Sequence, residues 1–126
     1  MNSSIFFSTF LRQEWISTAN KVKLLSWKGR LDLCLYASRR SPALLIDEIS
    51  NYVPRHSPSD WNAVISRARE FDDDGHACKF VRALAHGQRV CAPFEGNNAK
   101  FRIRGKMWLQ IANMGKHIYS HVWTSS

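Results

Sequence analysis

Residues 71–93, FDDDGHACKFVRALAHGQRVCAP, are the stretch of this sequence that most clearly predicts its fold. With successive residues 100° apart around a helix axis, Ala77, Val81 and Leu84 fall on one side of the stretch. His76 falls on the opposite side, in line with a row of basic residues. This division is typical of an amphipathic helix with one side packed and the other in water.

We expect this helix to cover residues 73–91. Gly75 lies near its start and weakens the first turn, because glycine is a poor helix former. Pro93 follows the last expected turn and should end the helix, because proline has no backbone N–H to donate.

Two segments before this stretch also carry helix signals. Apolar residues such as Trp27 and Leu31 recur at three- and four-residue steps, which predicts a helix over residues 15–37 with one apolar stripe. Ser41 and Pro42 suit the cap and the first position of a second, short helix.

A third helix is predicted over residues 58–70. Ser57 resembles an N-cap and Pro58 a first helical residue, while Asp60 occupies the acidic position of a capping box. Its inward side would be apolar, beginning with Trp61.

Basic and apolar residues alternate over residues 100–104, with the two-residue period of an exposed strand. The same residues could instead form an extended lead-in to a final short helix over residues 106–114. In either case the chain is expected to be mainly α, a small helical assembly.

The composition is that of one basic globular domain. A chain of 126 residues is one domain at most, and its net charge of +8 favours acidic partners, although the bases are scattered. No run of about 20 apolar residues exists to span a membrane, and the first residues do not resemble a secretory signal. Cys34, Cys78 and Cys91 lack metal-binding spacing and are expected to be reduced thiols of a cytoplasmic protein.

Asp73 and His76 are the candidate catalytic residues. Their three-residue spacing on a helix would let the carboxylate orient the imidazole for acid–base work. Acidic residues at a helix N-terminus also have an electrostatic explanation, because they interact favourably with the helix dipole. His117 and His121 are four apart but lack further ligands, so no metal site is expected.

The basic segment 100–106 offers a different class of function. With Phe101 and Trp108 it could lie along a nucleic-acid backbone and stack on bases. A solvated edge strand that carries basic residues against aggregation explains the same residues.

Several segments together resemble the C-terminal portion of the questin oxidase-like family. Their order and spacing fit over roughly residues 20–114. The segments are VKLLSWKGRLDLCLYASRRSP, LLIDEISNYVP, WNAVISRAREFDDDGHACKFVRALAHGQRVCAPFE and FRIRGKMWLQIANM.

The resemblance implies an all-helical oxidoreductase of fungal secondary-metabolite biosynthesis. Members are similar to NADPH-dependent, Baeyer–Villiger-like oxidases that open anthraquinone-type polyketide rings on the way to xanthone- or ergochrome-type products. The expected partner is therefore a small aromatic polyketide, and the resemblance leaves open whether a metal or a flavin takes part. Trp27 and Trp108 are candidates for binding such a flat substrate, and Trp61 could help, although tryptophans also build cores.

The chain departs from the family pattern in three places. Family members are several hundred residues long and carry a histidine-rich N-terminal region that is missing here. Lys106 stands where the motif resembling KGDMW has an acidic residue. The resemblance stops after Met114, so residues 115–126 are predicted to be a tail from outside the family, translated from an intron.

Residues 1–126 are thus interpreted as one partial questin oxidase-like domain. The alternative functions are a truncated, non-catalytic or partner-binding fragment of such an enzyme and, third, a basic nucleic-acid-binding module.

Overall fold

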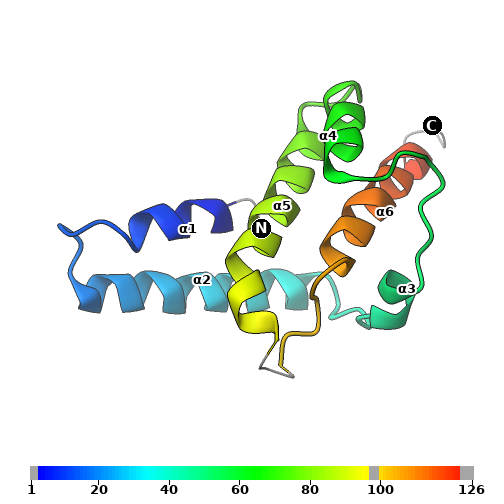
Figure 1. The fold of residues 1–126 in the computed structure, drawn as a ribbon. Coiled ribbons are helices and arrows are strands. Elements are labelled where there is room, and N and C mark those ends of the chain that lie inside the picture. The colour runs from blue at the N-terminus through cyan, green and yellow to red at the C-terminus, as the bar shows by residue number, and fades with distance from the viewer. Residues whose placement is uncertain (1–2, 97–99, 123–126) are drawn as a thin grey trace. The chain divides into compact units, whose positions relative to one another are not determined.

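The fold is seen in a computed structural model that describes residues 3–96 and 100–122, with side chains up to Gly115. These residues form six helices and no strand, which confirms the mainly α fold. The chain divides into two compact units, Met1–Leu44 and Leu45–Ser126, which we describe in turn. The helices, shown in Figure 1, are α1 Ser4–Phe10, α2 Thr18–Ser38, α3 Ile46–Ser50, α4 Trp61–Arg69, α5 His76–Glu95 and α6 Met107–Val122.

The first unit is a hairpin of α1 and α2. Helix α2 confirms the helix predicted over residues 15–37, and its first turn is capped by Ser17, whose side chain accepts a hydrogen bond from the Asn20 backbone N–H at 3.3 Å. Lys28 and Asp32 form an ion pair one turn apart on this helix.

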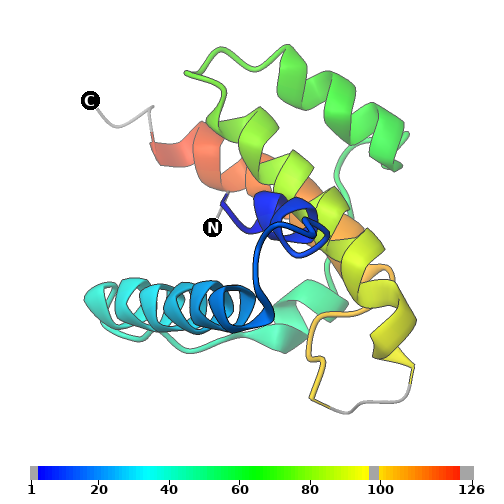
Figure 2. The same ribbon diagram turned by 90° about the vertical axis from the view of Figure 1, so that its left-hand side faces the viewer.

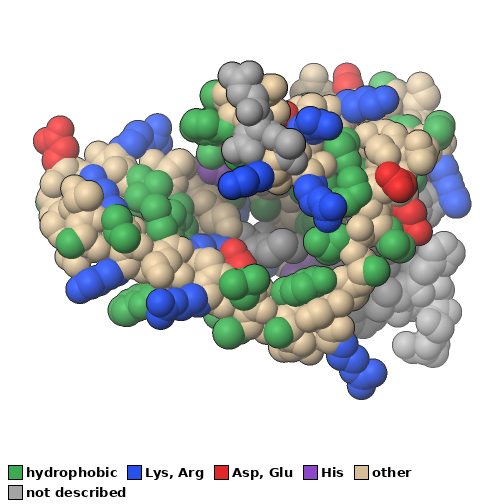
Figure 3. Space-filling view, turned by 90° about the horizontal axis from the view of Figure 1, so that it is seen from below, with side chains coloured by type: hydrophobic (Ala, Val, Ile, Leu, Met, Phe, Trp, Pro, Cys, Tyr) green, Lys and Arg blue, Asp and Glu red, His purple; other side chains and the backbone are tan. Residues whose placement is uncertain are grey.

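The structure does not show the single apolar stripe predicted for α2, because apolar residues lie on opposite sides of the helix. Trp27 and Leu31 lie on one side of the helix and Val22 and Leu33 on the opposite side, and all four are exposed, Trp27 to 64%. Figure 3 shows hydrophobic side chains at the molecular surface with lysines and arginines between them. A helix that is apolar on opposite sides is typical of one that packs against partners on both.

The second unit is built around the antiparallel pair α5 and α6, which lie side by side in Figures 1 and 2. Helix α4 packs mainly on α5, and the short α3 packs on α6. The small core between α4, α5 and α6 consists of Val64, Ala68, Ala77, Val81 and Ala112, with Trp61, Phe71, Cys78, Leu84 and Leu109 packed against it.

Two glycines let α5 and α6 approach closely. A Cβ atom added to Gly87 of α5 would lie 2.6 Å from Cζ3 of Trp108 on α6. A Cβ atom added to Gly115 of α6 would lie 2.5 Å from Cε1 of Phe80 on α5. Each helix therefore places an aromatic ring over a glycine of its partner, and the two contacts fix the register of the pair.

Two of the predicted helices start later in the structure than predicted. Helix α4 begins at Trp61 because Asp60, not Ser57, is its N-cap and accepts a hydrogen bond from the Ala63 backbone N–H at 2.8 Å. Helix α3 begins at Ile46 and is shorter than predicted. Ser41 is not its cap, because its backbone is left-handed with a φ of 45°.

The ends of α5 also differ from the prediction. The helix begins at His76 because Gly75 has a left-handed φ of 78°, and it continues through Pro93 to Glu95. Pro93 removes one backbone N–H donor, but Glu95, two residues later, holds the last turn of α5 in place through side-chain hydrogen bonds. The Glu95 carboxylate accepts hydrogen bonds from the Gly105 backbone N–H at 2.6 Å and from Trp108 Nε1 at 2.8 Å.

Residues 101–104 belong to neither a helix nor a strand and lead through a turn at residues 105–106 into α6, so of the two alternatives for residues 100–104 the lead-in to a helix is confirmed. The strand that motivated a nucleic-acid-binding edge is absent from the described residues. Helix α6 continues beyond residue 114 to Val122, because Gly115 costs a helix only about 1 kcal/mol and no proline follows. The side chains of His117 and His121 lie outside the described residues.

Candidate functional site

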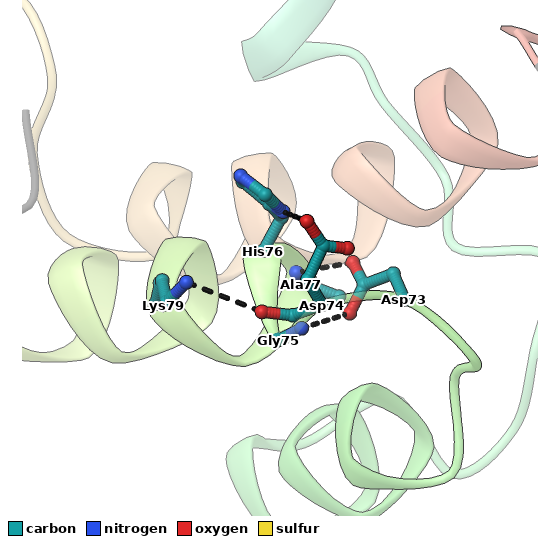
Figure 4. Close-up of polar contacts among 6 residues, drawn as sticks. All are labelled: Asp73, Asp74, Gly75, His76, Ala77 and Lys79. Atoms are coloured by element: carbon teal, nitrogen blue, oxygen red, sulfur yellow. Dashed lines mark hydrogen bonds and ion pairs between the residues drawn. The ribbon is translucent and has the colours of Figure 1, made fainter.

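The Asp73 carboxylate caps the first turn of α5 (Figure 4). Its Oδ1 accepts a hydrogen bond from the Gly75 backbone N–H at 2.8 Å, and its Oδ2 accepts one from the Ala77 backbone N–H, also at 2.8 Å. Asp73 therefore satisfies backbone donors that no helical carbonyl can reach. This arrangement agrees with the alternative explanation that an acidic residue here stabilises the N-terminus of the helix.

His76 pairs with a different carboxylate, and it does so in solvent. Its Nδ1 lies 3.7 Å from Oδ2 of Asp74, with exposed side-chain fractions of 59% and 85%. Lys79 Nζ closes the turn by donating to the Asp74 carbonyl at 3.2 Å. The structure thus does not join His76 to Asp73 by a described hydrogen bond, and a catalytic role for the two residues stays a prediction.

Replacing Asp73 with alanine should destabilise the second unit by about 1 kcal/mol, because two backbone N–H groups lose their acceptor. Asp74→Ala is the matched control and should change the free energy of unfolding by less than about 0.5 kcal/mol, since its side chain is exposed. Urea denaturation followed by circular dichroism measures both. Equal effects of the two substitutions would contradict the capping role.

The candidate substrate-binding tryptophans belong to different units of the fold. Trp27 is an exposed residue of the first unit. Trp108 belongs to the second unit, where its ring lies over Gly87 and its Nε1 donates to Glu95. Trp61 packs on the core and donates from its Nε1 to Gln88 Oε1 at 2.8 Å. Trp61 and Trp108 thus have packing roles, and substrate binding by Trp27 and Trp108 stays a prediction.

A hollow in the second unit, which we name the α4–α6 hollow, is a further candidate site. Its cavity volume is about 30 Å³, room for a water-sized group, and the empty space reaches about 500 Å³ only when the part open to solvent is included. Its lining comes from three parts of the sequence. These are the connection before α4 (Tyr52, Arg55, His56), the α4–α5 region (Val64, Arg67, Ala68, Phe71, Ala77, Phe80, Val81) and α6 (Ala112, Asn113, Gly115).

Asn113 is the polar centre of this hollow and is only 8% exposed. Its Oδ1 accepts a hydrogen bond from Arg67 Nη2 at 3.0 Å, and its Nδ2 donates to the carbonyls of Ser59 and Leu109, both at 3.0 Å. Tyr52 donates from its hydroxyl to the Asn113 carbonyl at 3.4 Å. One amide thus ties α6 to α4 and to the connection before α4.

Arg67 is held in place by this network. Its Nη1 donates to the Pro58 carbonyl at 2.8 Å while its Nη2 donates to Asn113. Arg55 and His56, also in the lining, are exposed residues of the loop between α3 and α4. The lining contains no acidic residue, so the hollow combines an apolar floor with a cationic edge.

Sequence reasoning missed this hollow, although one signal for Asn113 was present. The segment MWLQIANM is apolar except for Gln110 and Asn113, and Asn113 falls one turn after Leu109. An amide on the packed side of a helix requires buried hydrogen-bond partners. The partners themselves, Arg67 and Ser59, could not be identified from spacing.

Burial raises the pKa of the Cys91 thiol, and the nearby negative charge of Glu95 raises it further. The smaller thiolate fraction predicts that iodoacetamide near neutral pH alkylates Cys91 more slowly than the exposed Cys34. Raising the pH should then increase the rate at Cys91. Mass spectrometry of peptides from timed reactions measures both rates, and equal rates at the two cysteines near pH 7 would contradict the prediction.

Two further features of the described residues concern metal binding and membrane crossing. Among the described side chains, those of residues 3–96 and 100–115, no three from histidine, cysteine or acidic residues are grouped so as to hold a metal ion. No helix within the same ranges has the length and hydrophobicity that a membrane crossing requires.

Comparison with known proteins identifies the class. The profile of the family described as questin oxidase-like matches residues 1–84. Oxidoreductase AflY of Aspergillus parasiticus is 43% identical over 90% of this chain and 23% of its own length. The Baeyer–Villiger monooxygenase AacuH of Aspergillus aculeatus is 40% identical over 96% of this chain and 26% of its own. Questin oxidase of Aspergillus fumigatus is 39% identical over 90% of this chain and 26% of its own.

The chain belongs to the questin oxidase-like family. It spans about a quarter of the length of the curated relatives that it matches. The match to AacuH covers so much of the chain that it continues past Met114. The origin of residues 115–126 in an intron stays a prediction, which sequencing of the transcript tests.

Proposed function

We propose that this chain serves in an NADPH-dependent oxidoreductase of fungal aromatic polyketide biosynthesis, which opens an anthraquinone-type ring by Baeyer–Villiger oxidation. The observation that carries the proposal is the 39–43% identity, over at least 90% of the chain, to the oxidoreductase, the monooxygenase and the questin oxidase named above. The substrate class and the cofactor are those that the resemblance implies.

The proposed reaction inserts one oxygen atom of O₂ between a ring carbonyl carbon and the adjacent ring carbon. The carbon–carbon bond breaks, two carbon–oxygen bonds take its place, and the second oxygen atom leaves as water. This insertion gives a ring-expanded lactone, and hydrolysis of the lactone by one water molecule then opens the ring. NADPH, when bound, supplies the two electrons that this balance requires. The described residues contain no glycine-rich phosphate loop, so we assign none of them to NADPH and derive no step through it.

The test uses this chain alone and in the context of a relative. The purified chain is incubated with questin, NADPH and air. Mass spectrometry looks for a lactone heavier by one oxygen atom and for a ring-opened product heavier by one oxygen atom and one water molecule. In parallel, this chain replaces the matching segment of Aspergillus fumigatus questin oxidase, and circular dichroism checks that the chimera is folded. Product from either protein supports the proposal. An inactive chain together with a folded but inactive chimera, beside an active parent enzyme, would overturn it.

A non-catalytic, partner-binding role is the second candidate. The apolar residues exposed on opposite sides of α2, including Trp27 and Leu33, favour it, because such a helix is typically covered on both sides. This role predicts that the chain alone yields no product but binds and restores a questin oxidase that lacks the matching segment. The same assay with the two polypeptides mixed distinguishes it from the first candidate.

A further inference from the structure

We infer that the α1–α2 hairpin docks between two apolar surfaces of one partner, the remainder of a questin oxidase-like polypeptide, which covers α2 on opposite sides. The inference rests on the partner-binding role proposed above and names both the surface and the partner. It concerns the burial of α2, which can be measured without turnover.

Helix α1 covers a mainly charged stripe of α2. The half-buried residues of α2 recur at three- and four-residue steps and are Lys21, Leu24, Lys28 and Asp32. Among the described residues α1 is the only helix that packs on α2, so this stripe faces α1. The hairpin thus encloses the Lys28–Asp32 ion pair and leaves most leucines of α2 exposed. Because buried ion pairs add little stability, apolar contacts of α2 with another surface are expected.

Two apolar faces of α2 lie on either side of this stripe. The Leu31 face consists of Trp27, Leu31 and Cys34, and the Leu33 face consists of Val22, Leu25 and Leu33. Leu31 and Leu33 point about 160° apart around the helix axis. Their exposed fractions are 54% and 68%. Only a narrow basic strip with Lys23 and Arg30 separates the two faces opposite α1, and a helix that is apolar on so many sides is typically buried.

One polar atom of the hairpin also lacks a hydrogen-bond partner. Oδ1 of Asp32 is buried and accepts no hydrogen bond from the described residues, although Oδ2 of the same carboxylate pairs with Lys28. A buried carboxylate oxygen without a donor is costly, so a donor from outside the hairpin is expected. A partner that packs beside α1 on α2 can bring an N–H or O–H group to this oxygen.

A second copy of this chain does not cover both faces. A two-fold dimer buries the same patch on each copy, so it covers one face of α2 and leaves the opposite face in water. Copies that used both faces in turn would form an open chain rather than a closed assembly. The curated relatives instead carry the matching segment as 23–26% of one polypeptide, so most of their length lies outside it. This remainder is long enough to pack on both faces at once.

The first experiment compares thiol alkylation in the free chain and in the chimera with Aspergillus fumigatus questin oxidase described above. Cys34 reports the Leu31 face, and Leu33→Cys in a Cys34→Ser background reports the Leu33 face. Iodoacetamide should modify both thiols at least about 10-fold more slowly in the chimera, because covered thiols are less accessible to the reagent. Arg30→Cys in the same background lies on the basic strip and is the matched control, which should change less than about 2-fold.

The second experiment measures docking between separate polypeptides. The tagged full chain is co-expressed with Aspergillus fumigatus questin oxidase that lacks the matching segment, and the partner recovered on the tag is quantified. Leu31→Gln and Leu33→Gln should each lower the recovery at least about 5-fold, because each removes apolar surface that the partner covers. Leu44→Gln is the matched control: Leu44 is 62% exposed but lies outside α2, so the recovery should not change.

Rapid alkylation of both thiols in a folded chimera, or recovery that ignores Leu31→Gln and Leu33→Gln, would overturn the inference. A dimer of the free chain that protects one face, detected by analytical ultracentrifugation and alkylation, would overturn it in favour of a second copy. If the chimera does not fold, the co-expression decides, and failure to recover the partner counts against the inference. Protection of both thiols without product would support it while the proposed oxidation fails, and product from a chimera whose two thiols react rapidly would do the reverse.

Discussion

Asn113→Leu is expected to lower the free energy of unfolding of the second unit by about 2–4 kcal/mol. Leucine has a similar volume but can neither accept the hydrogen bond of Arg67 nor donate to the carbonyls of Ser59 and Leu109. The substitution leaves a partly buried guanidinium and a part-buried carbonyl without their partner. The cost of such groups, rather than the loss of contact area, determines the effect.

The control for this prediction is Asn62→Leu, the same substitution at an exposed position of α4. It should change the free energy of unfolding by less than about 0.5 kcal/mol. Hydrogen exchange of amides in α4 and α6 measures the stability of the second unit separately from that of the first. Equal destabilisation by the two variants would show that Asn113 is not the centre of the network.

A double substitution tests the network itself. If Arg67 and Asn113 act through their shared hydrogen bond, adding Arg67→Met to Asn113→Leu should cost less than Arg67→Met alone, because the arginine has already lost one acceptor. Strict additivity of the two free-energy changes would mean that the residues contribute independently.

The existence of the helices followed from the sequence, whereas their ends did not. Apolar periodicity reports which face of a helix is packed, and it correctly predicted α5 and its buried Ala77 and Val81. Helix ends depend on local hydrogen bonds, and here Asp60 and Asp73 cap turns at positions that the capping-box pattern did not predict. Pro93 stayed inside α5 because Glu95 anchors the last turn to residues ten and thirteen positions away.

The candidate site was less predictable than the fold, for a physical reason. The three-residue spacing of Asp73 and His76 predicts a catalytic pair, because it would bring both side chains to one helical turn. The same turn also offers each side chain a nearer partner, Asp74 for His76 and the α5 amides for Asp73. The α4–α6 hollow joins residues more than fifty positions apart, such as Arg55 and Asn113. Only tertiary packing brings these together, so no local spacing could indicate them.

Gly87→Ala is expected to destabilise the second unit by up to about 2 kcal/mol, although alanine is the better helix former. The added Cβ would lie 2.6, 3.0 and 3.3 Å from three ring atoms of Trp108, and the hydrogen bond from Trp108 to Glu95 restrains the ring from moving away. Such overpacking costs about 1–3 kcal/mol, whereas the gain in helix propensity is about 1 kcal/mol. Gly29→Ala is the matched control: Gly29 lies inside α2 with no other atom within 4 Å of an added Cβ, so the same substitution should stabilise its helix. Opposite signs for the two variants, measured by hydrogen exchange of α5 and α2 amides, would confirm the close packing of Gly87 against Trp108. Trp108→Leu in the Gly87→Ala background should recover part of the loss, because the smaller side chain removes the overlap that alanine creates.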